Sequence, residues 1–264
     1  MYQFKEDFNE NQFFWWDKKL IENMNWALLP KSSKAVFPVI ACHANNKGEA
    51  FPGEQTIAIL AGISNKIVRE GIRGLEAFPN FRCDYYLSRR GKRAKRFFLN
   101  IPSSNNGGSA FPFYKFILEA GIWREMRPIA KALYPVLRYF GFFDINLYSE
   151  LEGLEFCETD TEEVFPDREY DLCEAELKIL AEFAGIHRNS INAALNDLVR
   201  NFLIEPLTVL SGWKVFLKSK DNTIWKRDYL NKEILSSYRH IIQCTKTTDN
   251  DAQNLPKNAQ TGSV

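Results

Sequence analysis

The sequence has few residues of the kinds that bind metals or nucleotides. Its three histidines, His43, His187 and His240, lie far apart, and none of its five cysteines belongs to a Cys-x-x-Cys pair. Zinc sites and disulfide frameworks have more regular spacings, so neither is expected. The chain also has no Gly-x-x-x-x-Gly-Lys-Ser/Thr loop, which would hold nucleotide phosphates. We therefore expect no metal, no cofactor and no enzyme activity.

Long apolar runs are missing too, and no charged segment followed by an apolar one marks a signal peptide. These absences predict a cytoplasmic protein with reduced thiols and no membrane contact. Hydrophobic residues nevertheless make up 45% of the 264 residues, which is enough for a packed core.

The net charge of +1 hides two segments of opposite charge. Residues 26–104 contain 13 basic and 5 acidic residues, whereas residues 150–176 contain 12 acidic residues and 1 basic residue. Such asymmetry is typical of a nucleic-acid surface combined with an acidic segment. The acidic segment has two interpretations. It is either a solvated, mobile loop or a DNA mimic that covers the basic segment until DNA or a partner displaces it.

Residues 51–76 predict two helices joined by a tight turn. The first would run from about Glu54 to Ala61 and end at Gly62, because glycine adopts the positive φ of a helix end without strain. Ser64 would then cap the second helix by accepting a backbone N–H. Three apolar residues of the second helix recur at spacings of four and three, which places them on one inward face: Val68, Ile72 and Leu75.

The polar side chains of this second helix face outward, and a basic hairpin follows it. The outward residues are Asn65, Lys66, Arg69 and Arg73. Arginine pairs with guanine and asparagine with adenine in the major groove of DNA, so this helix is suited to reading bases there. Six of the eight residues from 89 to 96 are basic: Arg89, Arg90, Lys92, Arg93, Lys95 and Arg96. Six phosphate contacts would give log affinity a slope of about −5 against log salt.

The second half of the chain repeats the pattern of the first. Residues 29–41 match residues 126–138, and residues 54–64 match residues 177–187. The last helix of the repeat would present these residues outward: Arg188, Asn189, Asn192 and Asn196. Two interpretations remain open. This less basic helix either reads bases, with asparagine favouring adenine, or is a degenerate copy used for dimerisation.

Composition divides the chain into five segments. They are an aromatic N-terminal arm (1–25), a first domain (26–102), a linker (103–111), a second domain (112–243) with an acidic insertion at about 150–175, and a disordered tail (244–264). The arm contains Phe13-Phe14-Trp15-Trp16, which either packs on the first domain or contacts a partner. Ser32 or Ser33 is expected to cap the helix that follows.

The pattern from Phe51-Pro-Gly-Glu-Gln-Thr-Ile-Ala to Ile63-Ser-Asn-Lys-Ile-Val-Arg resembles the winged helix-turn-helix domains of plasmid, phage and integrative-element proteins. Two such units in one chain resemble the theta-type plasmid replication initiators. The resemblance covers about residues 26–101 and 112–225. It implies a mostly helical α+β fold with two winged helix-turn-helix domains in tandem.

We therefore expect sequence-specific binding to double-stranded DNA, and the resemblance implies origin recognition in replication initiation of a plasmid or other mobile element. The two helices would enter major grooves about one helical turn, or roughly 34 Å, apart. The implied partners are DNA, a second copy of the chain, and replication proteins such as helicase or primase. The alternatives are a transcriptional regulator of a mobile element, and a replisome or helicase-loading scaffold whose second winged helix binds protein.

Overall fold

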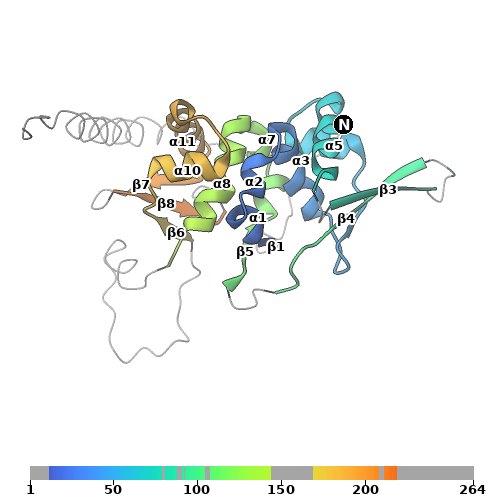
Figure 1. The fold of residues 1–264 in the computed structure, drawn as a ribbon, viewed down its shortest axis with the longest axis horizontal. Helices are drawn as coiled ribbons and strands as arrows, with labels where there is room; N and C mark the ends of the chain where they lie inside the picture. Colours follow the sequence, from blue (N-terminus) through green and yellow to red (C-terminus); the bar gives the residue numbers. More distant parts are fainter. Residues whose placement is uncertain are drawn as a thin grey trace, which may run out of the picture.

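The computed structural model describes residues 12–78, 81–87, 91, 93–104, 108–143, 169–207 and 211–218. Most of the acidic insertion, the end of the second domain from residue 219 to 243 and the tail at 244–264 lie outside these ranges. The described part is a mixed α+β structure with small antiparallel sheets (Figure 1). No helix within it combines the length and the apolar character needed to cross a membrane.

The first unit, residues 13–99, begins and ends in strands around a group of helices. Strands β2, β4 and β3 form its sheet, with β4 in the middle. The elements in chain order are β1 (Phe13–Asp17), α1 (Lys19–Glu22), α2 (Asn25–Leu28), α3 (Lys31–Cys42), β2 (Glu49–Ala50), α4 (Glu54–Ala61), α5 (Asn65–Glu76), β3 (Phe81–Leu87) and β4 (Arg93–Leu99).

The second unit, residues 110–216, has the same order of elements, and its sheet has the matching order β6-β8-β7. Its elements are β5 (Ala110–Tyr114), α6 (Phe116–Glu119), α7 (Ile122–Glu125), α8 (Pro128–Phe140), β6 (Tyr170–Cys173), α10 (Leu177–Ala184), the 3-10 turn η2 (Arg188–Ser190), α11 (Ile191–Arg200), β7 (Ile204–Pro206) and β8 (Trp213–Phe216). The repeat predicted from the sequence is therefore present, and it begins at β1 and β5, earlier than the matching residues indicated.

Local signals set the ends of α4 and α5 where the sequence predicts them. Gly62 has φ +66 and follows the last residue of α4, and the Ser64 hydroxyl accepts a hydrogen bond from the Ile67 N–H at 3.4 Å. The prediction that Ser32 or Ser33 caps α3 is wrong. The helix already begins at Lys31, after Pro30, and the buried Ser33 hydroxyl donates instead to the Gly71 carbonyl of α5 at 2.8 Å.

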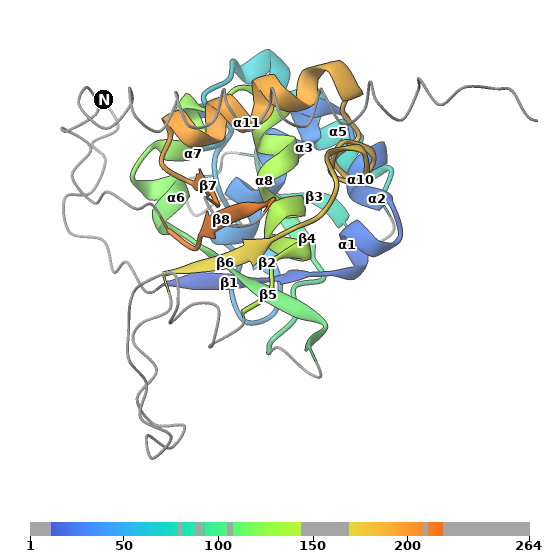
Figure 2. The same cartoon turned by 90° about the vertical axis from the view of Figure 1, so that its left-hand side faces the viewer.

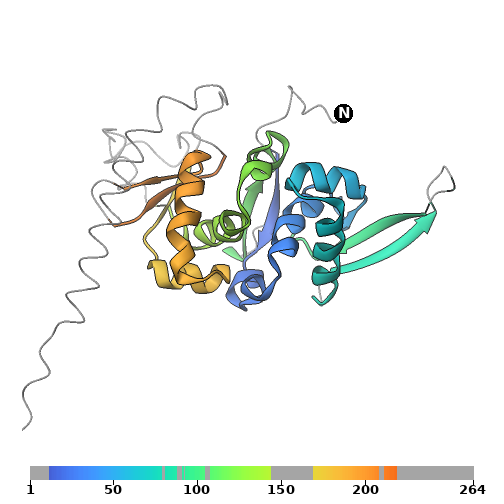
Figure 3. The ribbon, with the colours of Figure 1, turned by 90° about the horizontal axis from the view of Figure 1, so that it is seen from above.

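An approximate two-fold axis relates the two units. Strands β1 and β5 pair antiparallel with Trp15 opposite Pro112, which occupies the equivalent position 97 residues later. Because equivalent residues face each other in an antiparallel pair, the axis passes through this pair of positions. Figures 1 and 2 both show β1 and β5 together on one side of the molecule, and Figure 3 shows the two units on either side of the centre.

Two buried lysines make the contacts between the units reciprocal. The Lys34 ammonium donates to the Ala184 carbonyl at 2.8 Å, and the equivalent Lys131 donates to the Ala61 carbonyl at 2.7 Å. Each lysine thus satisfies the last carbonyl of a helix in the other unit, α10 or α4, where backbone acceptors have no partner within the helix. Burial lowers the pKa of both ammonium groups to about 8.

The core continues across both units. One hydrophobic cluster contains Trp16 and Ile57 of the first unit together with Leu133 and Leu195 of the second. The aromatic arm contributes to it, since Phe14 and Trp16 of β1 are buried. Trp16 packs on Trp26 and Phe37 of the first domain, as the packing interpretation predicts, but β1 itself pairs with β5 of the second unit. Residues 103–109 therefore connect two units that share a core.

Candidate nucleic-acid interface

Helices α5 and α11 lie on the same side of the molecule, opposite β1 and β5 (Figures 1 and 2). Each packs on the central helix of its own unit, α5 on α3 and α11 on α8. The two-fold axis therefore presents one helix from each unit on a common face. The hairpin of β3 and β4 extends from the outer side of the first unit (Figures 1 and 3).

Helix α5 has the two faces that the sequence predicts. Val68, Ile72 and Leu75 are buried against α3, and Gly71 allows a close approach because a Cβ there would clash with the Ser32 carbonyl. The four polar residues chosen from the sequence are all exposed: Asn65, Lys66, Arg69 and Arg73. The helix is thus anchored by its apolar side and presents three cationic groups and one amide to solvent.

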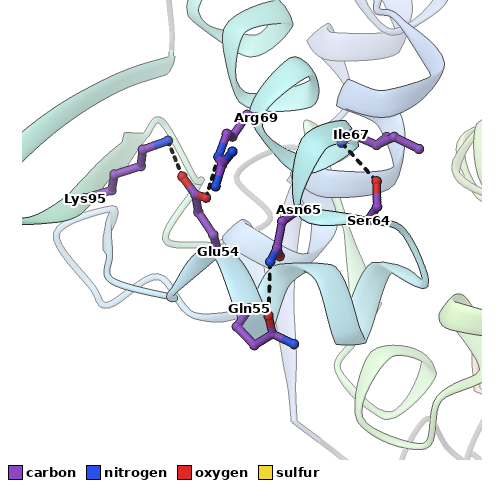
Figure 4. A network of polar contacts seen from close by, with 7 residues as sticks. All are labelled: Glu54, Gln55, Ser64, Asn65, Ile67, Arg69 and Lys95. Carbon is purple, nitrogen blue, oxygen red and sulfur yellow. Dashed lines mark hydrogen bonds and ion pairs between the residues drawn. The ribbon is translucent and has the colours of Figure 1, made fainter.

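Glu54, at the start of α4, joins α5 to the hairpin (Figure 4). One of its carboxylate oxygens lies 2.9 Å from Arg69 Nε, and the other lies 2.9 Å from Lys95 Nζ. Burial by itself would raise the pKa of this carboxyl, but hydrogen bonds and charges from Lys95 and Arg69 outweigh that effect, so the pKa lies below its usual value. The carboxylate is therefore ionised at neutral pH and holds two cations in place.

A second polar contact fixes the beginning of α5. The Asn65 side-chain amide donates to Gln55 Oε1 at 3.1 Å, next to the Glu54 contacts (Figure 4). Glu54 and Gln55 were not recognised from the sequence as members of the site. An acidic residue in the first turn of a helix is common, because it complements the helix dipole, so position 54 carried no specific signal.

The hairpin has two different faces, because directly paired residues of an antiparallel ladder lie on the same side of the sheet. Tyr85 pairs with Lys95 and Leu87 with Arg93, and the Lys95 contact to Glu54 shows that this side continues the surface of α4 and α5. Arg96 lies on the other side, where its guanidinium packs over the Phe98 ring at 4.6 Å. The predicted cationic hairpin is therefore divided between two surfaces.

Three of the hairpin cations predicted to bind DNA lie outside the described residues: Arg89, Arg90 and Lys92. Gly91 between them has φ +69, as expected of a turn residue. Of the described cations, Arg93 and Lys95 lie on the side that continues α5, whereas Arg96 Nη1 approaches Glu49 Oε1 at 3.8 Å on the opposite side.

In the second unit the predicted helix begins later than expected. Arg188 and Asn189 belong to the 3-10 turn η2 and are exposed, whereas α11 starts at Ile191. The His187 ring accepts a hydrogen bond from the Asn189 N–H at 3.2 Å, which is the capping role that Ser64 has in the first unit. Asn192 and Asn196 are half-buried on α11, less exposed than their counterparts on α5.

Each cation of α5 is replaced by asparagine at the equivalent position 123 residues later. Lys66, Arg69 and Arg73 correspond in this order to Asn189, Asn192 and Asn196. The residue equivalent to Glu54 is Leu177, so the carboxylate that holds two cations in the first unit has no counterpart. The two helices therefore have the same placement by symmetry and different chemistry.

Comparison with known proteins gives no family assignment. No family model matches the chain, and neither the curated proteins nor the solved structures contain a significant match. Within the described residues, no three histidine, cysteine, aspartate or glutamate side chains are grouped so as to hold a metal ion. The interpretation of this face therefore rests on its geometry and charge.

Proposed function

We propose that each unit is a winged helix-turn-helix domain and that the protein binds double-stranded DNA with the face that carries α5 and α11. The observation that carries this proposal is the continuity of the cationic surface. Helix α5 carries exposed lysine and arginine residues. The contacts of Glu54 with Arg69 and Lys95 connect this helix to the Lys95 side of the hairpin. A helix with a cationic hairpin beside it matches a major groove and its flanking phosphates.

In this proposal the side chains of α5 have separate roles. Arg69 hydrogen-bonds a guanine edge and Asn65 an adenine edge, the pairings that fit the major groove. Lys66 and Arg73 contact phosphates, which supply most of the salt-dependent affinity. The second unit reads bases through its asparagines with less attraction to the backbone, apart from Arg188 in η2.

The symmetry of the chain also predicts how the two half-sites are arranged on the DNA. A two-fold relation between recognition elements is matched by a two-fold relation between half-sites, as in the operators of dimeric proteins. One chain would therefore read two half-sites in inverted orientation, spaced by about one helical turn or roughly 34 Å. Because α5 is cationic and α11 is rich in asparagine, the two half-sites would differ in base content.

We assign this binding to origin recognition in replication initiation of a plasmid or other mobile element. Support comes from the presence of both reading helices in one chain, so that a monomer covers a complete site. Directly repeated copies of that site can then each bind one chain. A regulator that binds one palindrome as a dimer would need only one such helix per chain.

Selection of bound sequences from a random duplex pool, with the intact protein, tests the proposal. We expect two motifs of unequal content at a fixed spacing. Two motifs at variable spacing within one bound site would contradict the fixed placement of the two helices. A single short motif would leave α5 as the only reader and would favour a protein-binding role for the second unit. No enrichment at any salt concentration would refute DNA binding.

A further inference from the structure

Leu87 is the last residue of β3, and its side chain is 76% exposed. It shares a side of the hairpin with Tyr85, Arg93 and Lys95, because Leu87 pairs with Arg93 and Tyr85 with Lys95. The Lys95 contact to Glu54 directs this side toward the surface of α5. A large apolar side chain thus stands among cations on the face that we propose to meet DNA.

Tyr85 and Leu87 differ in what covers them. The Arg93 guanidinium lies 3.9 Å from the centre of the Tyr85 ring, so one face of that ring is occupied by a cation. Leu87, by contrast, belongs to neither hydrophobic cluster of the described residues, so its side chain remains open to solvent. The hairpin carries it away from the body of the protein (Figures 1 and 3), roughly 7 Å beyond the Tyr85–Lys95 pair at about 3.4 Å per residue.

We propose that Leu87 inserts between base pairs in the minor groove beside the major groove occupied by α5. This inference rests on the proposed function. The exposed Arg93, which pairs with Leu87, would bind a neighbouring phosphate and hold the hairpin in the groove. Apolar wedges of this kind partly unstack one base step and kink the duplex by 20–90° toward the major groove. The first unit would therefore bend its DNA as well as bind it.

The second unit does not offer the same wedge within its described residues. Strands β7 and β8 pair over three residues, whereas β3 and β4 pair over seven. Leu207, the apolar residue that follows β7, is buried. The bend would consequently lie off the centre of the site, on the side read by α5.

The test compares the intact protein with Leu87→Ala on the duplex obtained from the random-pool selection. A 2-aminopurine base is placed in turn at each step beside the α5 half-site, and the bend is measured by energy transfer between the duplex ends. The unaltered protein should raise the 2-aminopurine fluorescence at one step and bend the duplex. Leu87→Ala should abolish the fluorescence rise and reduce the bend by at least about half.

Two further variants keep the test decisive. Leu28→Ala removes a leucine that is 78% exposed on α2 and should change neither signal. Leu87→Lys adds a charge for phosphate but removes the wedge, so it should bind at least as tightly while losing the kink. An unchanged bend and fluorescence with Leu87→Ala would overturn the wedge and leave DNA binding intact. Absence of binding by the unaltered protein would overturn both proposals.

Discussion

Trp26 and Trp123 exchange equivalent hydrogen bonds across the centre of the molecule. The Trp26 indole donates to the Ala132 carbonyl of α8 at 2.8 Å, and the Trp123 indole donates to the Ala35 carbonyl of α3 at 3.0 Å. All four residues are buried. Because each bond has its symmetric copy, both units contribute equivalent donors and acceptors to the contact between them.

Replacing Lys131 by methionine should remove a pH dependence of stability. The ammonium has a pKa of about 8 in the folded protein and 10.5 as its ordinary value, so the unfolded chain binds more protons between these pH values. The free energy of unfolding should therefore rise with pH from about 8 to 10.5, and this contribution should be absent in Lys131→Met. Urea denaturation at several pH values measures the difference.

Lys131→Met should lower the free energy of unfolding most at the alkaline end of this pH range. The loss there should be about 1–3 kcal/mol, because the buried Ala61 carbonyl loses its hydrogen-bond donor. Lys66→Met, which alters an exposed lysine, is the control and should leave the pH profile unchanged. Parallel profiles for the unaltered protein and Lys131→Met would contradict the prediction.

Gly62→Ala should destabilise the protein through the contact between units. A Cβ at this position would clash with the Arg124 carbonyl of α7, and the residue also has φ +66. Gly108→Ala is the matched control, since Gly108 has φ +77 but open space around it. The left-handed conformation costs about 1–2 kcal/mol in both variants. Thermal denaturation should show a clearly larger loss of stability for Gly62→Ala than for Gly108→Ala. Equal losses would contradict the prediction, because they would mean that Arg124 shifts to accommodate the added methyl group.

Arg69→Ala and Asn192→Ala should affect different half-sites. Each should cost about 1–3 kcal/mol on the selected duplex and relax specificity at one position, Arg69→Ala in the half read by α5 and Asn192→Ala in the other. Repeating the random-pool selection with each variant locates the relaxed position. If both variants relaxed specificity in the same half-site, the assignment of one helix to each half-site would be contradicted.

Glu54→Gln should weaken discrimination between DNA sequences more than it weakens the fold. The ion pairs of Glu54 are partly exposed, so the free energy of unfolding should change by about 1 kcal/mol or less. Release of Arg69 and Lys95 should tighten nonspecific binding at low salt and lower the ratio of specific to nonspecific affinity. Titration of both kinds of duplex by fluorescence anisotropy measures this ratio.

Glu22→Gln makes the same change of charge on α1, an exposed position away from the proposed interface. It should leave the ratio of affinities unaltered. If both glutamine variants changed nonspecific binding equally, the effect would come from net charge alone, and Glu54 would have no positioning role.

Sequence reasoning located α4, the turn and α5 because their signals are local. Gly62, Ser64 and the spacing of Val68 and Ile72 all act within one or two helical turns. It missed the pairing of β1 with β5, which joins strands 97 residues apart and leaves no pattern in either strand alone. A run of four aromatic residues does not alternate, so it did not indicate a strand with one buried face.

The candidate site was predictable in part for the same reason. The exposed cations of α5 follow from helical periodicity, whereas the role of Glu54 depends on partners 15 and 41 positions away. Lys34 was also missed, because lysine is rarely buried and its acceptor at Ala184 belongs to the other unit. Contacts that depend on how two units pack cannot be read from the periodicity of either one.

The shared core fixes the separation of α5 and α11 as rigidly as any pair of helices within one domain. In the proposed complex with DNA, a flexible connection would let the two helices follow half-sites at several spacings, whereas this packing would not. One base pair inserted between half-sites turns the second by about 35° around the DNA axis, since a turn takes 10–10.5 base pairs. The affinity of the protein for its site would therefore depend on the spacing between the half-sites as strictly as on their base sequence.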